Sequence, residues 1–151
     1  MRSYLVVMDE TEEALTALRY AARRAARTGG GVEILALIPP VEFSQWGAVQ
    51  AAIEEEARLR AEAMLAQASG EIAEEAGIKP SVTVKQGEPV KAVGELLDER
   101  DDISALVLGA SPQGGPGPLI THFAGAAAAA LPCPLIIVPA GLTDEALERL
   151  S

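Results

Sequence analysis

The sequence contains few of the features that several classes of protein require. A single cysteine among 151 residues excludes a fold stapled by disulfides and leaves no second thiol for redox chemistry. Only 12 lysines and arginines stand against 22 aspartates and glutamates, which gives a formal net charge of -10. Because no broad basic surface can form, neither nucleic acid nor an anionic membrane is an expected partner.

Aromatic residues are scarce, and long apolar runs are missing. Aromatic side chains make up only 3% of the chain, which argues against a flavodoxin-like electron carrier, because flavin sites recruit stacking rings. The N-terminus reaches Asp9 after a short apolar run, too soon for a signal peptide or a membrane span. We therefore expect a cytoplasmic protein with a single domain over residues 1–151.

Five short apolar segments predict β-strands. Residues 4–8 are a continuous apolar run of the kind that fills a strand buried on both faces, and the largely apolar segments 32–38, 103–108 and 134–138 predict three further strands. The segment 81–85 alternates instead, as an edge strand does.

Helix-type sequence fills the intervals between these strands. The periodicity predicts a helix from Thr11, a long amphipathic helix over 48–76 with a weak point at Ser69-Gly70, and a helix that opens at Pro89. A short helix is expected through the alanine run 126–130, and another at about 142–150. Residues 41–47, with Phe43 and Trp46, are expected to form a loop.

This alternation predicts an α/β fold with a five-stranded parallel sheet and helices on both faces. Five such units favour the flavodoxin-like or Rossmann-like strand order 3-2-1-4-5. In that order, the loops after the first and fourth strands meet at the point where the strand order reverses, and ligands bind there. Asp9 and the loop after Leu108 would then share one site.

The loop after the fourth strand is the main candidate for a ligand site. Residues 109–118 contain four glycines and three prolines before helix-type sequence resumes at Leu119. Such a loop can point backbone N–H groups at the start of a helix, where a phosphate is favoured.

The order of several motifs resembles the universal stress protein family over about residues 3–139. Asp9 ends the first strand, Gly87-Glu88-Pro89 opens the third helix, Gly109 ends the fourth strand, and Leu131-Pro-Cys-Pro-Leu-Ile-Ile-Val-Pro139 closes the sheet. The resemblance implies a dimeric module with a stress-response regulatory or binding role. One branch of the family binds ATP, and another does not.

The ATP-binding branch carries Gly, two residues, Gly, nine residues, Gly and then Ser or Thr. This sequence departs from that spacing in both possible registers, and each register places Pro112 at a glycine position. Pro112, Pro116 and Pro118 also remove three backbone donors from the loop. The loop is therefore a degenerate version of a nucleotide or phosphate site, and we expect weak ATP binding or none.

The resemblance and the loop together imply candidate contacts for ATP, or for another small anionic nucleotide or phosphate. These are Asp9, Leu37, Gly109, Ser111, Gly114, Gly115, Gly117, Thr121 and His122. Catalytic residues and metal ligands are not expected. Asp9 is equally suited to capping the first helix, His122 to a polar role at a helix start, and Cys133 to packing as a small hydrophobe.

Three functions remain open from the sequence. A non-enzymatic stress-response module accounts for the whole order of elements. A nucleotide hydrolase of weak activity would need a metal-holding carboxylate, for which Asp9 is suitable, but no lysine or arginine lies between Ala110 and Ala130. A flavodoxin-like electron carrier is the third candidate function.

A homodimer is expected through the fifth strand. Residues 134–138 are apolar on both faces and lie at a sheet edge in the proposed order, and such an edge invites pairing.

Overall fold

The structure of the chain is a computed structural model that describes residues 2–9, 11–38 and 47–151. Its elements follow one another as β1 (Ser3–Met8), α1 (Glu12–Thr28), β2 (Gly31–Ile38), α2 (Gly47–Ala76), β3 (Ser81–Gln86), α3 (Pro89–Glu99), β4 (Ile103–Ala110), α4 (Gly117–Phe123), the 3-10 helix η1 (Ala128–Ala130), β5 (Leu135–Pro139) and α5 (Asp144–Leu150). The expected loop at 41–47, with Phe43 and Trp46, lies almost wholly outside the described residues.

The five strands form one parallel sheet in the order β3-β2-β1-β4-β5, as the sequence predicted. β1 lies between β2 and β4, with Val6 opposite both Ile34 and Val107. β5 pairs with β4 at one end of the sheet, and β3 pairs with β2 at the other. The strand order reverses between β1 and β4, so the carboxyl ends of these two strands border a crevice.

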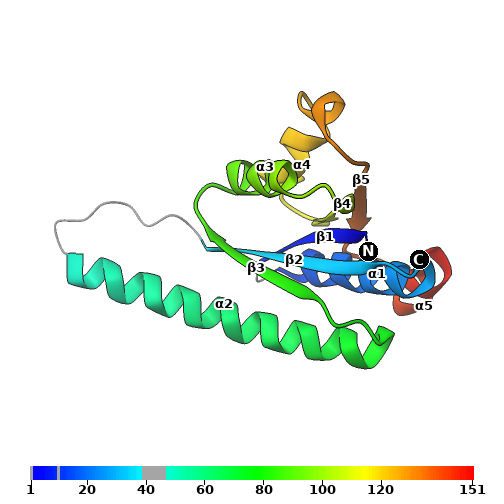
Figure 1. Cartoon of the computed structure of the whole chain (residues 1–151), viewed down its shortest axis with the longest axis horizontal. Coiled ribbons are helices and arrows are strands. Elements are labelled where there is room, and N and C mark those ends of the chain that lie inside the picture. The colour runs from blue at the N-terminus through cyan, green and yellow to red at the C-terminus, as the bar shows by residue number, and fades with distance from the viewer. Residues whose placement is uncertain (1, 10, 39–46) are drawn as a thin grey trace.

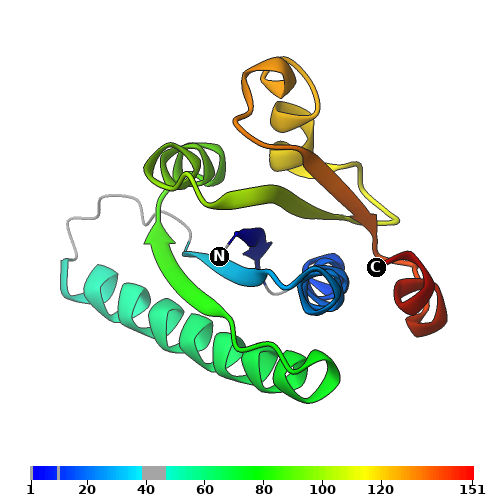
Figure 2. The ribbon, with the colours of Figure 1, turned by 45° about the vertical axis from the view of Figure 1, so that its right-hand side comes forward.

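Helices cover both faces of the sheet, and each face has its own core (Figures 1 and 2). Alternate strand residues point to opposite sides, so Val6 and Ile34 pack against α1, α2 and α5, whereas Leu5 and Leu35 pack against α3 and α4. This double coverage explains why the central strands are largely apolar. Among the described residues, no helix has both the length and the hydropathy that a membrane span needs.

The ends of α1 use the residues expected from the sequence. The Thr11 side chain caps the helix by accepting a hydrogen bond from the Ala14 N–H at 3.3 Å, and Glu12 and Glu13 lie in the first turn near the positive end of the helix dipole. Gly29 ends the helix with a φ of 73°, a left-handed conformation that glycine adopts at little cost.

The long helix α2 is continuous from Gly47 to Ala76, and Ser69-Gly70 does not interrupt it. Its C-terminal half buries one face against the sheet and α1, through Leu65, Ala68 and Ile72. The N-terminal half extends past the sheet in Figure 1, which leaves Val49 57% and Ile53 50% exposed.

The expectation of a helix through residues 126–130 is wrong. α4 ends at Phe123, and only the single 3-10 turn η1 follows, at Ala128–Ala130. Most of the residues from 124 to 130 are exposed, so the alanines have little packing to support a helix despite their high intrinsic propensity. The predicted C-terminal helix is confirmed, since Thr143 caps α5.

An ionic cluster joins α3 to the sheet at the amino ends of the strands. Glu33 of β2 is only 2% exposed, and its Oε1 accepts a hydrogen bond from Thr83 Oγ1 at 2.5 Å and lies 3.6 Å from Arg100 Nη1. Among the described residues, its second oxygen has no hydrogen-bond partner. Arg100 also donates to both carboxylate oxygens of Asp102, at 2.6 and 2.7 Å, and these hydrogen bonds hold the pKa of Asp102 below its ordinary value.

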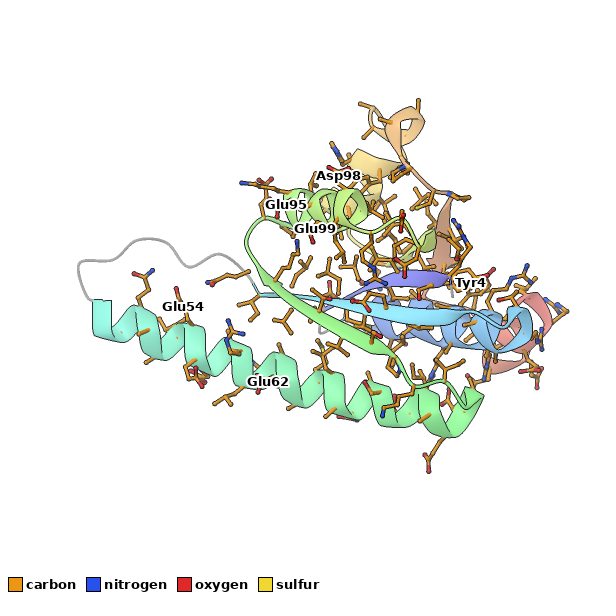
Figure 3. The ribbon with its side chains drawn as sticks, viewed as in Figure 1. Tyr4, Glu54, Glu62, Glu95, Asp98 and Glu99 are labelled. Carbon is orange, nitrogen blue, oxygen red and sulfur yellow. The ribbon has the colours of Figure 1, made fainter. Side chains whose placement is uncertain are left out.

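Lys85 of β3 adds a weaker link to α3. Its Nζ lies 3.4 Å from Glu99 Oε1 and 3.7 Å from Glu95 Oε2, and Figure 3 shows both acidic side chains on α3. These acidic side chains are largely exposed, so the contacts contribute little to stability.

Replacing Arg100 with Met should destabilise the fold by about 2 kcal/mol, because the buried carboxylate of Glu33 would lose its ion-pair partner. Breaking a fully buried ion pair would lower the free energy of unfolding by more than this, but the Arg100 side chain is 32% exposed. Urea unfolding at neutral pH measures the effect, and Arg24→Met on the exposed side of α1 is the matched control. Equal midpoints for the two variants would show that Arg100 does not stabilise Glu33.

Candidate functional site

The main cavity lies at the carboxyl ends of β1 and β4, where the strand order reverses. Its volume is about 420 Å³. The walls come from the starts of α1, α3 and α4 as well as from the strands. Its lining residues are Val7, Asp9, Thr11, Glu13, Ala14, Leu37, Gly87, Pro89, Leu108, Gly109, Pro116, Gly117, Pro118, Leu119 and Ile120.

Gly109 allows β4 to approach α1 at the base of this cavity. A Cβ built on Gly109 would lie 2.0 Å from the carbonyl oxygen of Glu13, far inside the contact distance of two heavy atoms. Glycine is therefore required at this position by packing, whatever the ligand. Glu13 is itself among the residues that line the cavity.

Asp9 both lines the cavity and organises the start of α1. Its Oδ1 accepts hydrogen bonds from the Thr11 N–H, at 3.0 Å, and from the Thr11 hydroxyl. The same hydroxyl oxygen accepts from the Ala14 N–H, so Asp9 fixes the residue that caps α1. The two roles considered for Asp9, a structural one and a ligand contact, are thus compatible.

Two further hollows adjoin Asp9 on the side of α2. One, of about 240 Å³, lies between α1 and α2 and is lined by Met8, Asp9, Thr11, Leu15, Met64, Gln67, Ala68 and Glu71. The other, of about 230 Å³, lies between the end of β2 and α2. It is lined by Asp9, Leu37, Ile38, Ala57, Arg60, Ala61 and Met64.

The structure brings together some of the predicted site residues and not others. Asp9, Leu37, Gly109 and Gly117 line the main cavity, although they come from three strand ends and the start of α4. The remaining predicted residues are not among those that line it, namely Ser111, Gly114, Gly115, Thr121 and His122.

The polar groups of the β4–α4 loop largely satisfy one another. Ser111 Oγ donates to the Gln113 carbonyl at 2.8 Å and accepts from the Gln113 N–H at 3.2 Å. His122 is exposed in the last turn of α4, where its ring stands edge-on to Phe123 with the centroids 4.8 Å apart. These side chains therefore have local roles in the described structure.

The chemistry of the main cavity is apolar and acidic. Its only charged lining residues among those described are Asp9 and Glu13, and two prolines of the loop, Pro116 and Pro118, offer no backbone N–H. α4 has only seven residues, so its N-terminus offers a weaker dipole than the sequence suggested. Such a cavity suits a ligand with an apolar ring and donor groups better than it suits a bare phosphate.

The family can now be assigned. The model of the universal stress protein family matches residues 1–139. The chain belongs to the universal stress protein family. No curated protein sequence matches it significantly.

Solved structures of universal stress proteins share the fold. A universal stress protein UspA from Lactobacillus plantarum superposes with a TM-score of 0.76 at 16% identity, over 91% of this chain and 97% of that one. A universal stress protein in complex with cAMP superposes with a TM-score of 0.60 at 23% identity, over 91% of this chain and 96% of that one. A family member from Arabidopsis thaliana with AMP bound superposes with a TM-score of 0.57 at 14% identity, over 92% of each chain.

Sequence reasoning did not place Thr11, Glu13 or Arg60 at the site of this universal stress protein. Thr11 was expected only at the start of a helix, and Arg60 falls within the long helix expected over 48–76. Gly87 and Pro89 belong to a turn that the family resemblance did identify, but the resemblance gave no reason to place them at the cavity.

Metal and thiol chemistry gain no support from the described part of the chain. Within residues 2–9, 11–38 and 47–151, no group of three or more His, Cys, Asp or Glu side chains is placed to hold a metal ion. Cys133 is half-buried, and burial raises its pKa, which disfavours the reactive thiolate.

Replacing Gly109 with Ala should destabilise this universal stress protein by about 1–3 kcal/mol, because the new methyl group must displace the backbone of α1. Gly94→Ala is the control, since a Cβ there meets nothing within 4 Å and should stabilise α3 by up to about 1 kcal/mol. Thermal unfolding of both variants measures the difference. A Gly109→Ala protein as stable as the wild type would contradict the packing argument.

Proposed function

We propose that this universal stress protein is a non-enzymatic regulatory module of the stress response, and that its main cavity binds a nucleoside or a nucleoside monophosphate. The observation that carries the proposal is a mostly apolar cavity of about 420 Å³ at the reversal of strand order, with Asp9 in its wall. Ligands of α/β sheets bind at this position. The proposal also includes a single domain over residues 1–151 and a cytoplasmic location.

The size of the cavity supports a ligand with few phosphate groups. Ligand pockets commonly span roughly 300–1,000 Å³, so a volume of about 420 Å³ lies at the small end of that range. The structures of family members with cAMP and with AMP bound give this ligand class a precedent on the same fold.

The charges near the cavity oppose a triphosphate. Asp9 and Glu13 are acidic, the net charge of the chain is -10, and Pro116 and Pro118 cannot donate backbone hydrogen bonds. Each additional phosphate adds a negative charge that these groups do not neutralise. ATP is therefore proposed to bind more weakly than AMP.

The described residues also favour binding over catalysis. Phosphoryl transfer needs a group that positions the attacking water, and His122 does not line the cavity. Asp9 Oδ1 is already engaged by Thr11, so this oxygen is poorly suited to serve as a general base.

Titration calorimetry with AMP, cAMP, and ATP with magnesium tests the ligand class. We expect binding of AMP at micromolar concentration and at least tenfold weaker binding of ATP, about 1.4 kcal/mol. Leu37→Ala, in the cavity wall, should weaken AMP binding by about fivefold through lost apolar contact, while Val82→Ala on the distant edge strand should not.

Two outcomes would overturn the proposal. Failure of the wild-type protein to bind any of the three nucleotides would remove the nucleotide site. Tight ATP binding with release of inorganic phosphate would instead support the alternative, an ATP-binding universal stress protein with weak hydrolase activity.

The proposal includes a homodimer formed through β5. This strand ends the sheet, no described strand pairs with its outer edge, and Ile137 is 42% exposed on it. An unpaired apolar edge favours association with a second copy, and Pro139 limits the length of the shared ladder because it has no N–H.

Replacing Ile137 with Lys should convert the dimer to a monomer, because the charge would be buried without a partner. Light scattering on the purified protein measures the mass. Val82→Lys places the same charge on β3 at the opposite edge, where Val82 is also 42% exposed, and should leave the dimer intact. A dimer that survives Ile137→Lys would place the interface elsewhere.

A further inference from the structure

We propose that α5 is a reversibly docked cover, held in place largely by charge, which hides a basic surface of α1. This surface consists of Arg19, Arg23 and Arg27 and is called the arginine row below. α5 lies beyond residue 139, where the match to the family model ends, so the inference concerns a segment that this model does not include. It is independent of the proposed nucleotide site.

The arginine row concentrates positive charge in an acidic chain. Four of the 12 lysines and arginines fall within residues 19–27, whereas the whole chain has a net charge of -10. The three members of the row are spaced four residues apart, so they lie on one side of α1. Figures 1 and 2 both show α5 beside α1.

Oxygen atoms of α5 contact each member of the row. Arg27 Nη2 lies 2.6 Å from Glu148 Oε1, and Arg23 Nε lies 3.8 Å from Glu148 Oε2. Arg23 Nη1 also donates a hydrogen bond to the Asp144 carbonyl at 3.2 Å, and Arg19 Nη1 lies 3.8 Å from Asp144 Oδ1. The side chain of Arg23, in the middle of the row, is consequently only 16% exposed.

The apolar attachment of α5 is small. The helix has seven residues, and isolated helices of this length are unstable in water, so α5 should stay helical only while it is docked. Of these seven residues only Leu147 is buried, and Leu150 is exposed. A short terminal element with one buried anchor opens at a lower free energy than the core of the domain does.

The ion pairs of α5 are of the kind that salt weakens. The carboxylates of Asp144 and Glu148 are largely exposed, and exposed ion pairs are screened as the Debye length shortens. α1 itself does not depend on these contacts, because its apolar face packs in the core of the domain. Release of α5 therefore exposes a row of guanidinium groups on an intact helix, and an anionic group must compete with α5 to reach it.

Hydrogen exchange of the full chain, followed by mass spectrometry at about 0.05 M and about 0.5 M sodium chloride, tests the reversible docking. We expect the amides of residues 147–151 to exchange about tenfold faster at the higher salt concentration, while those of the buried segment 20–25 in α1 keep their rate. Arg27→Met should accelerate exchange in α5 by about fivefold at low salt. Arg24→Met is the matched control, because Arg24 is exposed on the same helix and has no ion pair within the described residues.

Chemical modification of arginine tests whether α5 hides the row. Phenylglyoxal reacts with accessible guanidinium groups, and peptide mass spectrometry locates the adducts. In the wild-type protein at low salt, Arg23 should react at least about fivefold more slowly than Arg24, as expected for a cover that is mostly closed. High salt or Arg27→Met should reduce this difference, whereas Arg24→Met should leave the rate at Arg23 unchanged. Thermal unfolding checks that both variants are folded.

Three results would overturn the inference. Exchange of α5 at the same rate as the α1 core would show that α5 is an integral part of the fold. Faster exchange of α5 that depends on neither salt nor Arg27 would show that charge does not hold it. Opening of α5 without increased reactivity at Arg23 would show that α5 does not hide the arginine row.

Discussion

The close packing of β4 against α1 is the constraint on which the geometry of the cleft depends. Because Gly109 has no Cβ, the end of β4 lies against the carbonyl of Glu13, and the start of α1 is brought to the mouth of the crevice. Asp9 and Thr11 then fix that start through their mutual hydrogen bonds. Packing, helix capping and the cavity wall are therefore properties of the same few residues, which explains why structural and ligand-binding roles coincide there.

The fold was predictable because its strongest signals are local. Strands buried on both faces must be mostly apolar, and β1, β2 and β4 are, so their number and parallel arrangement follow from the sequence. The alanine run after α4 misled the prediction, because intrinsic propensity favours a helix only weakly without an apolar face to bury. The residues there are largely exposed, and the chain forms one 3-10 turn instead.

The site was predictable only in part, for a related reason. Asp9, Leu37 and Gly109 lie at strand ends, and the strand order alone places those ends together. Arg60 reaches the same place only because a long helix crosses beside β2, which no local pattern specifies. Ser111 illustrates the limit of loop composition, which predicts a ligand contact but not the local hydrogen bonds that its hydroxyl group makes with Gln113.

Membership of a family fixes the position of a cleft more firmly than it fixes the charge of the ligand. The universal stress protein fold supplies a crevice between β1 and β4, but the side chains around it belong to each sequence. Here the loop carries prolines where backbone donors would be needed, while the one basic residue among the described lining residues comes from α2. A net charge of -10 also opposes the approach of any anion, so the fold of the family does not by itself determine the charge of the ligand that this cleft accepts.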